Sequence, residues 1–409
     1  MSEAAFLDLL RPSTRVYLSA GSAEPLALAP LLSNHADRLN GVDIIGSFVP
    51  GVNDTDYAAL HPGARMTTLL LPSAARDSFK AGRVSILPLS YFGFAQHLRR
   101  YPPDIAVVQV APPDADGNCS LGPAADFAPL VWHKARHRIA FINRSLPQAP
   151  GSWRVRRSEI DVAIECDGPV PGLAPAKAST TAAAIARNAA RMVEDGATLQ
   201  VGLGGAPAAI LASLTDRHKL SIHSGMIGDE IVPLADAGAL APAGHCTGIA
   251  IGSEALYDWL PQAVGFDFVP TPQTHGPLAL AQRDRLIAIN SALEVDLLGQ
   301  ANLEWRHGKL VSGAGGAPNF LTGAHLSPGG LAIIALPSTA RDISRIIPRI
   351  TAPTVSLGKN LIDVVVTEHG VAHIGDLPME QRAQALIGIS APEKRADLQQ
   401  QWEKLRNSF

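Results

Sequence analysis

The chain has 409 residues, enough for two domains of ordinary size, each with its own hydrophobic core. It is 46% hydrophobic and 17% charged, which is a globular composition. The formal net charge is −3 and no block of like charges occurs, which argues against a nucleic-acid-binding or polybasic membrane surface.

The cysteine pattern and the first residues indicate a compartment. The three cysteines are far apart and form no CxxC pair, as expected in a reducing environment. The N-terminal residues lack the apolar core of a secretory signal, and no apolar run reaches the roughly 18–20 residues needed to span a bilayer. We therefore expect a cytoplasmic protein with no membrane partner.

Short apolar runs alternate with helical patterns along the whole chain. Because the runs are continuous rather than alternating, they predict parallel strands covered on both faces. They lie at 42–49, 83–89, 104–112, 138–143 and 198–204, with later examples at 286–289 and 329–337.

A proline-rich segment at 167–180 reads as a linker between two halves. Ser179 or Thr180 is expected to cap a helix running to about Gly196, a fitting stop. We therefore predict two α/β domains, 1–175 and 176–409. The second half opens as helix, strand, glycine loop and helix, and it ends in a polar helix with an apolar seam of Leu398, Trp402 and Leu405.

Two glycine-rich loops are candidates for ligand contact. In QVGLGGAPAAIL (200–211), a strand runs into Gly202, Gly204 and Gly205, and a helix starts near Pro207. Such a loop brings backbone amides close to a ligand, and the helix N-terminus favours an anion. The motif is neither GxGxxG nor a P-loop, so a plain tight turn is the alternative. SGAGGAPNF (312–320) could likewise aim amides at an oxyanion, or be an ordinary surface loop.

Three polar features can be interpreted either as structural or as catalytic or metal-binding. His223 has no histidine partner at metal-ligand spacing, so a structural role is favoured over metal binding. Cys246 in GHCTG resembles a nucleophile elbow but lacks the strand–turn–helix context. In NSALEVDLLGQ (290–300), Glu294 and Asp296 share one side of a strand, and the pattern alone favours a structural or solvated carboxylate over a nucleophile.

Eight blocks of the chain together resemble the acetyl-CoA hydrolase/transferase family, which includes 4-hydroxybutyrate and succinyl-CoA:acetate CoA-transferases. The likeness extends from about Tyr17 to Ala391. The order and spacing of the blocks are specific, although no single block is. They are AGSAEPLAL (20–28), VAPPDADGNCSLG (110–122), TLQVGLGGAPAAIL (198–211), IHSGMIGDEIVPLADAGAL (222–240), IGSEALYDWL (251–260), INSALEVDLLGQANLE (289–304), SGAGGAPNF (312–320) and VVVTEHGVAHIGDL (364–377).

The resemblance implies two open, mostly parallel α/β domains of the CoA-transferase type, with the active site between them. It also implies a catalytic glutamate that carries acyl and then CoA. Family members place this glutamate in an H-S/T-E-M block or in an A-L-E-V-D block. The first block here contains Gly225, which cannot serve, so the comparison assigns the role to Glu294.

The same resemblance assigns CoA contacts to the glycine loops. The residues are Gly202, Leu203, Gly204, Gly205, Ala206 and Gly316, with Gly313 and Gly315 joining by proximity. The implied activity is ping-pong CoA transfer between an acyl-CoA and a short carboxylic acid through a glutamyl-CoA thioester. Coenzyme A is then a substrate, and no permanent cofactor or metal is expected. The alternatives are an acyl-CoA hydrolase using the same glutamate and a non-catalytic CoA-binding relative. A homodimer or larger assembly is expected.

Overall fold

The computed structural model describes residues 2–175, 177 and 179–408. They form two compact units. The first takes in the chain up to residue 175 together with 225–229 and 243–274, and the second takes in the rest. The predicted division was a single cut after residue 175. In the structure, the segments 225–229 and 243–274 group with the first unit instead of the second. Both units combine helices with mostly parallel strands, so the predicted α/β fold class is confirmed.

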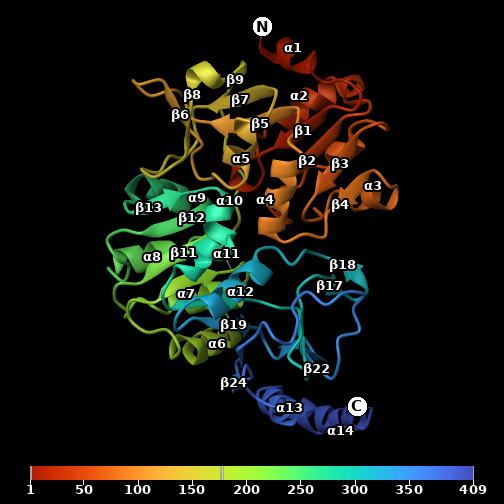
Figure 1. Ribbon diagram of the computed structural model, residues 1–409, viewed down its shortest axis with the longest axis vertical. Helices are drawn as coiled ribbons and strands as arrows, with labels where there is room; N and C mark the ends of the chain where they lie inside the picture. The colour runs from red at the N-terminus through yellow and green to blue at the C-terminus, as the bar shows by residue number, and fades with distance from the viewer. Residues whose placement is uncertain (1, 176, 178, 409) are drawn as a thin grey trace. The chain divides into compact units, whose positions relative to one another are not determined.

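The first unit is built on a seven-stranded sheet in the order β4-β3-β2-β1-β5-β7-β9, and all neighbouring strands are parallel. One hydrophobic core lies between this sheet and the helices α4 and α5, which lie side by side (Figure 1). The sheet strands are β1 (Arg15–Leu18), β2 (Asp43–Gly46), β3 (Arg65–Thr68), β4 (Val84–Ile86), β5 (Ile105–Val110), β7 (His137–Asn143) and β9 (Val162–Cys166).

The first unit also contains two further strand pairs and several α-helices. They are the strand pairs β6 (Asn118–Ser120) with β8 (Arg154–Arg156) and β12 (His245–Ala250) with β13 (Phe266–Phe268), and the helices α1 (Ser2–Leu7), α2 (Leu28–Asn34), α3 (Arg76–Lys80), α4 (Tyr91–Arg100), α5 (Ala128–Trp132), α9 (Glu254–Trp259) and most of α10 (Thr271–His275).

In the second unit the strands follow the order β11-β10-β14-β19-β23-β24. The neighbours paired with β10, β14 and β19 are parallel, and β24 runs antiparallel to β23. The strands are β10 (Thr198–Val201), β11 (Ser221–Ile227), β14 (Leu286–Asn290), β19 (Leu331–Ala335), β23 (Val364–Thr367) and β24 (Gly370–His373). The helices are α6 (Thr180–Ala190), α7 (Gly205–Ala212), α8 (Ile231–Asp236), α11 (Pro277–Ala281), α12 (Ala317–Leu326), α13 (Met379–Gly388) and α14 (Arg395–Arg406).

A three-stranded sheet of order β16-β15-β22 follows β14 and sets the position of Glu294. One face carries Val295, Ala301 and Ile346, which are fully buried in the core of the second unit. Burial of this face fixes which side chains point the other way, because strand side chains alternate. The strands are β15 (Glu294–Asp296), β16 (Ala301–Asn302) and β22 (Ile346–Ile347), and the nearby hairpins are β17 (Trp305–Arg306) with β18 (Lys309–Leu310) and β20 (Thr339–Ala340) with β21 (Ile343–Ser344).

The predicted helix after the linker begins as expected and ends early. The Ser179 hydroxyl accepts a hydrogen bond of 3.0 Å from the backbone N–H of Ala182, as an N-cap does. The α-helix stops at Ala190 rather than near Gly196. At and beyond this end, the Arg217 guanidinium donates hydrogen bonds to the carbonyl oxygens of Ala190 and Val193, at 3.1 and 2.9 Å. Within the predicted linker, residues 176 and 178 lie outside the described residues.

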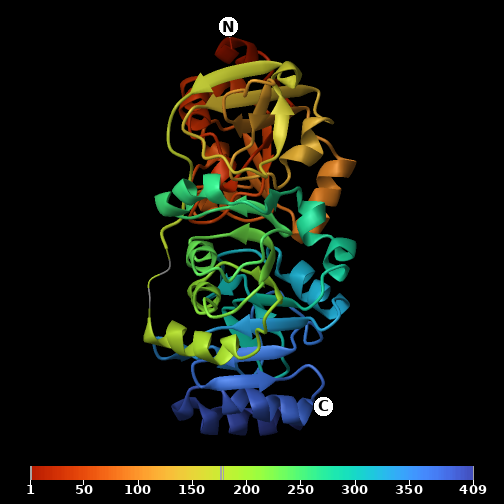
Figure 2. The same ribbon diagram turned by 90° about the vertical axis from the view of Figure 1, so that its left-hand side faces the viewer.

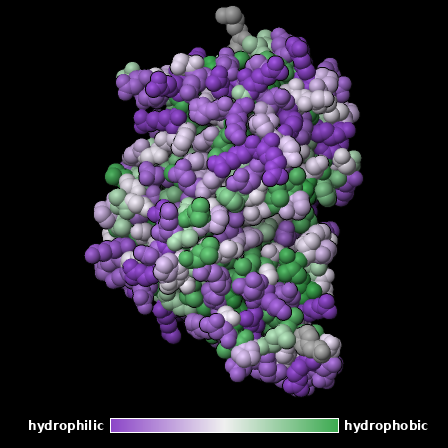
Figure 3. All heavy atoms as spheres, viewed as in Figure 1, coloured by the Kyte–Doolittle hydropathy of each residue, from purple (hydrophilic) through white to green (hydrophobic). Residues whose placement is uncertain are grey.

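The C-terminal helix is confirmed. Leu398 and Trp402 of α14 are buried in the core, and Leu405 packs against it. Figure 2 shows α13 and α14 paired beside β24. No described helix is both long and apolar enough to cross a bilayer. On the face shown in Figure 3, apolar and polar side chains are interspersed.

Candidate active site

Three polar side chains form a row across the face of the three-stranded sheet that points away from Val295. Asn302 lies opposite Glu294 in the antiparallel pair of β16 and β15. On the other side, Val295 is in register with Ile346 of the parallel strand β22, and the Val295 N–H donates to the Arg345 carbonyl at 2.8 Å. Since alternate residues share a face, Glu294 and Arg345 are neighbours on the same side. The row is therefore Asn302, Glu294, Arg345.

Among the described residues, the Glu294 carboxylate is held through one of its two oxygens. Its Oε2 accepts a hydrogen bond of 2.9 Å from the Asn302 amide. Within the described part of the chain, no hydrogen bond reaches Oε1. The Glu294 side chain is partly exposed, although Val295 and Asp296 of the same strand are buried. One oxygen anchored by an amide and one oxygen unengaged is an arrangement that permits attack on an electrophile.

Asp296, two residues further along, has a structural role. It is fully buried, and its carboxylate accepts hydrogen bonds from the backbone N–H groups of Leu298, Gln300 and Ile350 at 3.1, 2.9 and 3.2 Å. The Gln300 side-chain amide adds a fourth at 2.9 Å. These bonds fix the turn after β15, as expected for a buried carboxylate whose acceptor capacity is satisfied.

The first glycine loop lies against the end of β14. An added Cβ at Gly202 would come 2.7 Å from Asn290 Oδ1, and one at Gly204 would come 3.4 Å from Ser291 Cβ. Gly204 also has φ +133°, a conformation that favours glycine. The loop and residues 290–294 therefore leave the sheet at the carboxyl ends of β10 and β14, where ligands bind in open α/β sheets. The helix α7 begins at Gly205, two residues before the predicted start.

The second glycine loop begins α12 and rests on a buried histidine. An added Cβ at Gly316 would lie 2.5 Å from His275 Nε2 and 2.8 Å from its Cδ2. The His275 ring also packs on Phe320, with centroids 4.5 Å apart. Burial, with a smaller contribution from nearby His223, lowers the pKa of His275 to about 3, so the ring is neutral near pH 7. Gly315 has φ +58°, which allows the backbone to turn into the helix.

The other candidate residues are integrated in the fold. His223 is buried on β11, in the same block as Gly225. Cys246 is buried on β12, so it occupies a strand and not a strand–helix elbow. Among the described residues, no group of three or more histidine, cysteine, aspartate or glutamate side chains could hold a metal ion.

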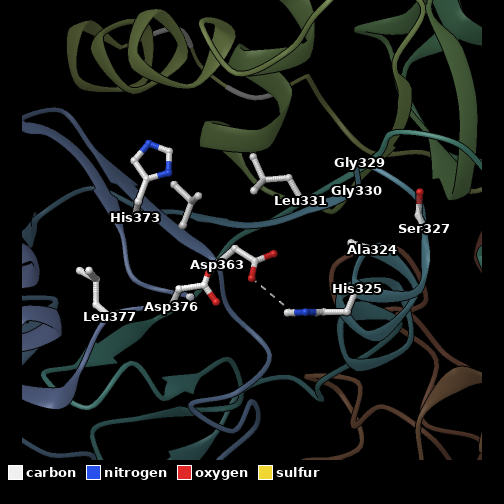
Figure 4. A pocket seen from close by; sticks show the side chains of 12 residues that line it. Ala324, His325, Ser327, Gly329, Gly330, Leu331, Asp363, His373, Asp376 and Leu377 are labelled. Carbon is white, nitrogen blue, oxygen red and sulfur yellow. Dashed lines mark ion pairs between the residues drawn. The ribbon is translucent and has the colours of Figure 1, made fainter.

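A separate pocket lies at the amino ends of β19 and β23, with a volume of about 410 Å³. Figure 4 shows the Asp363 carboxylate directed at His325, whose Nε2 is 3.7 Å from Asp363 Oδ1. The other Asp363 oxygen accepts from the Ala332 N–H at 2.9 Å. This pocket is at the opposite strand ends from Gly202 and Asn290, so we assign the glycine loops and Glu294 to a different site.

Sequence reasoning missed Asn302, Arg345 and His275. Asn302 stands inside the block that carries the resemblance, but its register with Glu294 depends on a turn that no pattern predicts. Arg345 is brought alongside by β22, whose residues lie 51 positions further along the chain than the residues of β15 with which they pair. His275 lay among thirteen scattered histidines, and only a buried contact with Gly316 distinguishes it.

Known proteins match this chain over most of its length. The profile of the acetyl-CoA hydrolase/transferase C-terminal domain matches residues 252–402. The 4-hydroxybutyrate coenzyme A transferase of Clostridium kluyveri is 34% identical, with 96% of this chain and 94% of that protein covered. The chain belongs to the acetyl-CoA hydrolase/transferase family.

Solved structures agree with this membership. RipA from Yersinia pestis matches with a TM-score of 0.93 at 26% identity, covering 99% of this chain and 97% of that one. A 4-hydroxybutyrate CoA-transferase from Porphyromonas gingivalis matches with a TM-score of 0.80 at 29% identity, covering 100% and 97%. The family resemblance predicted from the sequence blocks is confirmed.

Proposed function

We propose that this protein is a CoA-transferase that exchanges CoA between an acyl-CoA and a short carboxylic acid, with Glu294 as the nucleophile. The observation that carries the proposal is the full-length likeness to a CoA-transferase. The partly exposed Glu294, with one unengaged oxygen at the carboxyl edge of the sheet, supports the assignment of the nucleophile.

In the first half-reaction, a Glu294 oxygen attacks the thioester carbonyl carbon of the acyl-CoA. The C–S bond breaks, and CoA thiolate and a mixed anhydride result. The bound thiolate then attacks the Glu294 carbonyl carbon of the anhydride. This step releases the original acyl group as a carboxylate and leaves a glutamyl-CoA thioester. The acceptor acid reverses both steps and departs as its CoA ester.

Each attack creates a tetrahedral oxyanion that requires hydrogen-bond donors. We assign this role, and the contacts to CoA, to the backbone of Gly202, Leu203, Gly204, Gly205, Ala206, Gly313, Gly315 and Gly316. A single backbone or side-chain donor of this kind typically contributes about 3–4 kcal/mol to transition-state stabilisation. The two loops begin α7 and α12, whose free N–H groups favour a developing negative charge.

The test is intact-protein mass measurement after incubation with an acyl-CoA. We expect an adduct of the mass of CoA that hydroxylamine removes, and we expect Glu294→Gln to form none. The matched control is Glu304→Gln, a partly buried glutamate of the same unit whose carboxylate accepts from Ser356. If Glu294→Gln still forms the adduct, another residue is the nucleophile. If no acyl-CoA gives an adduct with the wild type, the covalent mechanism is wrong.

A hydrolase is the second candidate, because the family includes acetyl-CoA hydrolases by its description. It would use the same thioester, with water in place of the acceptor acid. Thiol release from acyl-CoA without any acceptor acid distinguishes the two. Continuous release indicates a hydrolase, whereas a single stoichiometric release indicates a transferase.

A non-catalytic CoA-binding relative is a third candidate, favoured by Gly225 in the H-S-G-M block. It predicts CoA binding by calorimetry with no adduct, no exchange and no hydrolysis.

As parts of the same proposal, we place the protein in the cytoplasm and expect a homodimer or larger assembly. Light scattering after size exclusion measures the assembly, and a monomer would contradict it.

A further inference from the structure

Arg345 is a partly buried cation beside the proposed nucleophile. It precedes β22, on the face of the sheet that also carries Glu294. Burial is the main cause that lowers the pKa of Arg345, and nearby Arg306 adds to it. Glu294 and Glu368 act in the opposite direction and favour the charged form. The guanidinium therefore lies in an electrostatic field to which Glu294 contributes.

The Arg345 guanidinium has no close partner among the residues that the structure describes. In the part of the chain that the structure describes, no carboxylate oxygen lies within 4.0 Å of it, and its side chain makes no hydrogen bond. The nearby Glu368 carboxylate is already engaged, since Ser338 donates to it through N–H at 2.8 Å and through Oγ at 2.7 Å. A guanidinium with five donors and no acceptor is suited to a carboxylate from outside the chain.

We propose that Arg345 binds the carboxylate of the acid substrate while Glu294 carries CoA. This inference rests on the proposed function of Glu294. In the free protein the Glu294 carboxylate offsets the charge of Arg345 and repels a second carboxylate. In the glutamyl-CoA thioester Glu294 is neutral, so the charge of Arg345 is no longer offset. The acid then enters where its carboxylate meets the guanidinium.

The charges balance through the second half-reaction. An oxygen of the bound acid attacks the glutamyl thioester carbonyl carbon, the C–S bond breaks, and the negative charge passes to CoA thiolate. The thiolate then attacks the acyl carbon of the mixed anhydride, whose C–O bond to Glu294 breaks. The Glu294 carboxylate is restored beside Arg345, and its charge again opposes a second acid. This alternation favours release of the new acyl-CoA before another acid binds.

The experiment uses Arg345→Met and Arg345→Lys in the full-length protein. The glutamyl-CoA form is prepared with acyl-CoA, and its consumption is followed against acid concentration. We expect Arg345→Met to raise the half-saturating acid concentration about 10- to 100-fold, the range of a lost charge-assisted hydrogen bond. Arg345→Lys keeps the charge without the planar fork, so its increase should be smaller. Half-saturation for acyl-CoA should change less than about threefold, since CoA contacts are assigned to the glycine loops.

Cleavage of the glutamyl-CoA thioester by hydroxylamine distinguishes acid binding from a structural role. If Arg345 only held the site in shape, its loss would also slow this cleavage. As an uncharged nucleophile at pH 8, hydroxylamine should cleave the thioester of Arg345→Met and of the wild type at equal rates. Arg306→Met, which removes a neighbouring exposed charge, is the matched control and should leave acid half-saturation near the wild-type value.

Three results would overturn the assignment: unchanged acid half-saturation, an equal loss of hydroxylamine cleavage, or a folded Arg345→Met protein that forms no adduct. Failure of the nucleophile itself is recognised separately, because Glu294→Gln would then still form the adduct whatever Arg345→Met does.

Discussion

Asn302 lies directly opposite Glu294, and its amide donates a hydrogen bond of 2.9 Å to Glu294 Oε2. The same side chain fixes the turn after β16. Its Oδ1 accepts from the N–H groups of Glu304 and Trp305 at 3.0 and 2.9 Å, and Nδ2 donates to the Trp305 carbonyl at 2.8 Å. A fully buried amide thus joins the proposed nucleophile to the local backbone.

Asn302→Asp should destabilise the protein, because it keeps the shape and the Oδ1 acceptor but replaces the donor with a carboxylate oxygen facing Glu294. We expect the free energy of unfolding at pH 7.5 to fall by about 1–3 kcal/mol, the usual cost of an unsatisfied buried group. Urea unfolding measures it. Asn34→Asp, which adds the same charge at an exposed position, should stay near wild type. An Asn302→Asp protein as stable as that control would contradict the described row.

Gly316→Ala should disturb the second glycine loop, since the new Cβ would overlap the His275 ring at 2.5 Å. Overpacking of this kind typically costs about 1–3 kcal/mol of stability. Under the proposed function, the half-saturating acyl-CoA concentration should rise as well. Urea unfolding and acyl-CoA titration measure the two effects.

The double variant Gly316→Ala with His275→Ala identifies the cause. Removing the ring frees the space that the methyl group needs, so the two costs should sum to more than the cost of the double variant. The coupling should be at least about 0.5 kcal/mol, as is typical of residues in contact. Strictly additive costs would show that the methyl group does not meet the histidine.

The sequence predicted several of the parallel strands, including β14 and β19, because each of these is a continuous apolar run. It also predicted that the side chains of Glu294 and Asp296 point to one side of a strand and that of Val295 to the other. It did not predict their roles, because these depend on partners far along the chain. Asp296 is buried by the turn that it caps, and Glu294 lies on the same face as Arg345 only because β15 pairs with β22. A periodic pattern specifies a face, whereas long-range register decides what lies beside it.

His275 should make the protein less stable in mild acid. Its pKa of about 3 in the folded state, set mainly by burial, lies below the value of about 6.5 expected when unfolded. Between these values the unfolded chain binds a proton that the folded chain does not, so stability falls as pH drops below about 6.5. From pH 7.5 to 5 this histidine should remove about 2 kcal/mol.

His275→Asn carries no titrating ring, so its loss of stability between pH 7.5 and 5 should be smaller than that of the wild type by this amount. Urea unfolding at both pH values measures it. His35→Asn, at an exposed position, is the control and should reproduce the wild-type pH dependence. Equal pH dependence in His275→Asn and wild type would mean that the buried ring is protonated.

Asp126 should have the opposite pH dependence. Burial raises its pKa to about 7, and the hydrogen bond of 2.8 Å from the Thr271 hydroxyl only partly opposes this shift. The folded protein holds a proton on Asp126 at pH values where the unfolded chain, with an ordinary carboxyl, has lost it. This contribution to stability is complete near pH 4, declines as pH rises, and is lost above about pH 7.

The Asp126 residue is partly exposed, which reduces the expected effect. Asp126→Asn should therefore be more stable than the wild type at pH 8, by about 2 kcal/mol, and similar to it at pH 4. Asparagine can accept the same hydrogen bond, and it tolerates the left-handed backbone at this position, where φ is +44°. Urea unfolding at the two pH values measures the difference.

Asp114→Asn is the contrasting control. The hydrogen bond from the backbone N–H of Asn118 lowers the pKa of Asp114, so the ionised Asp114 carboxylate stabilises the turn. That variant should lose stability at pH 8, and an Asp126→Asn variant that behaves likewise would show that the Asp126 carboxylate is favourably ionised in the folded protein.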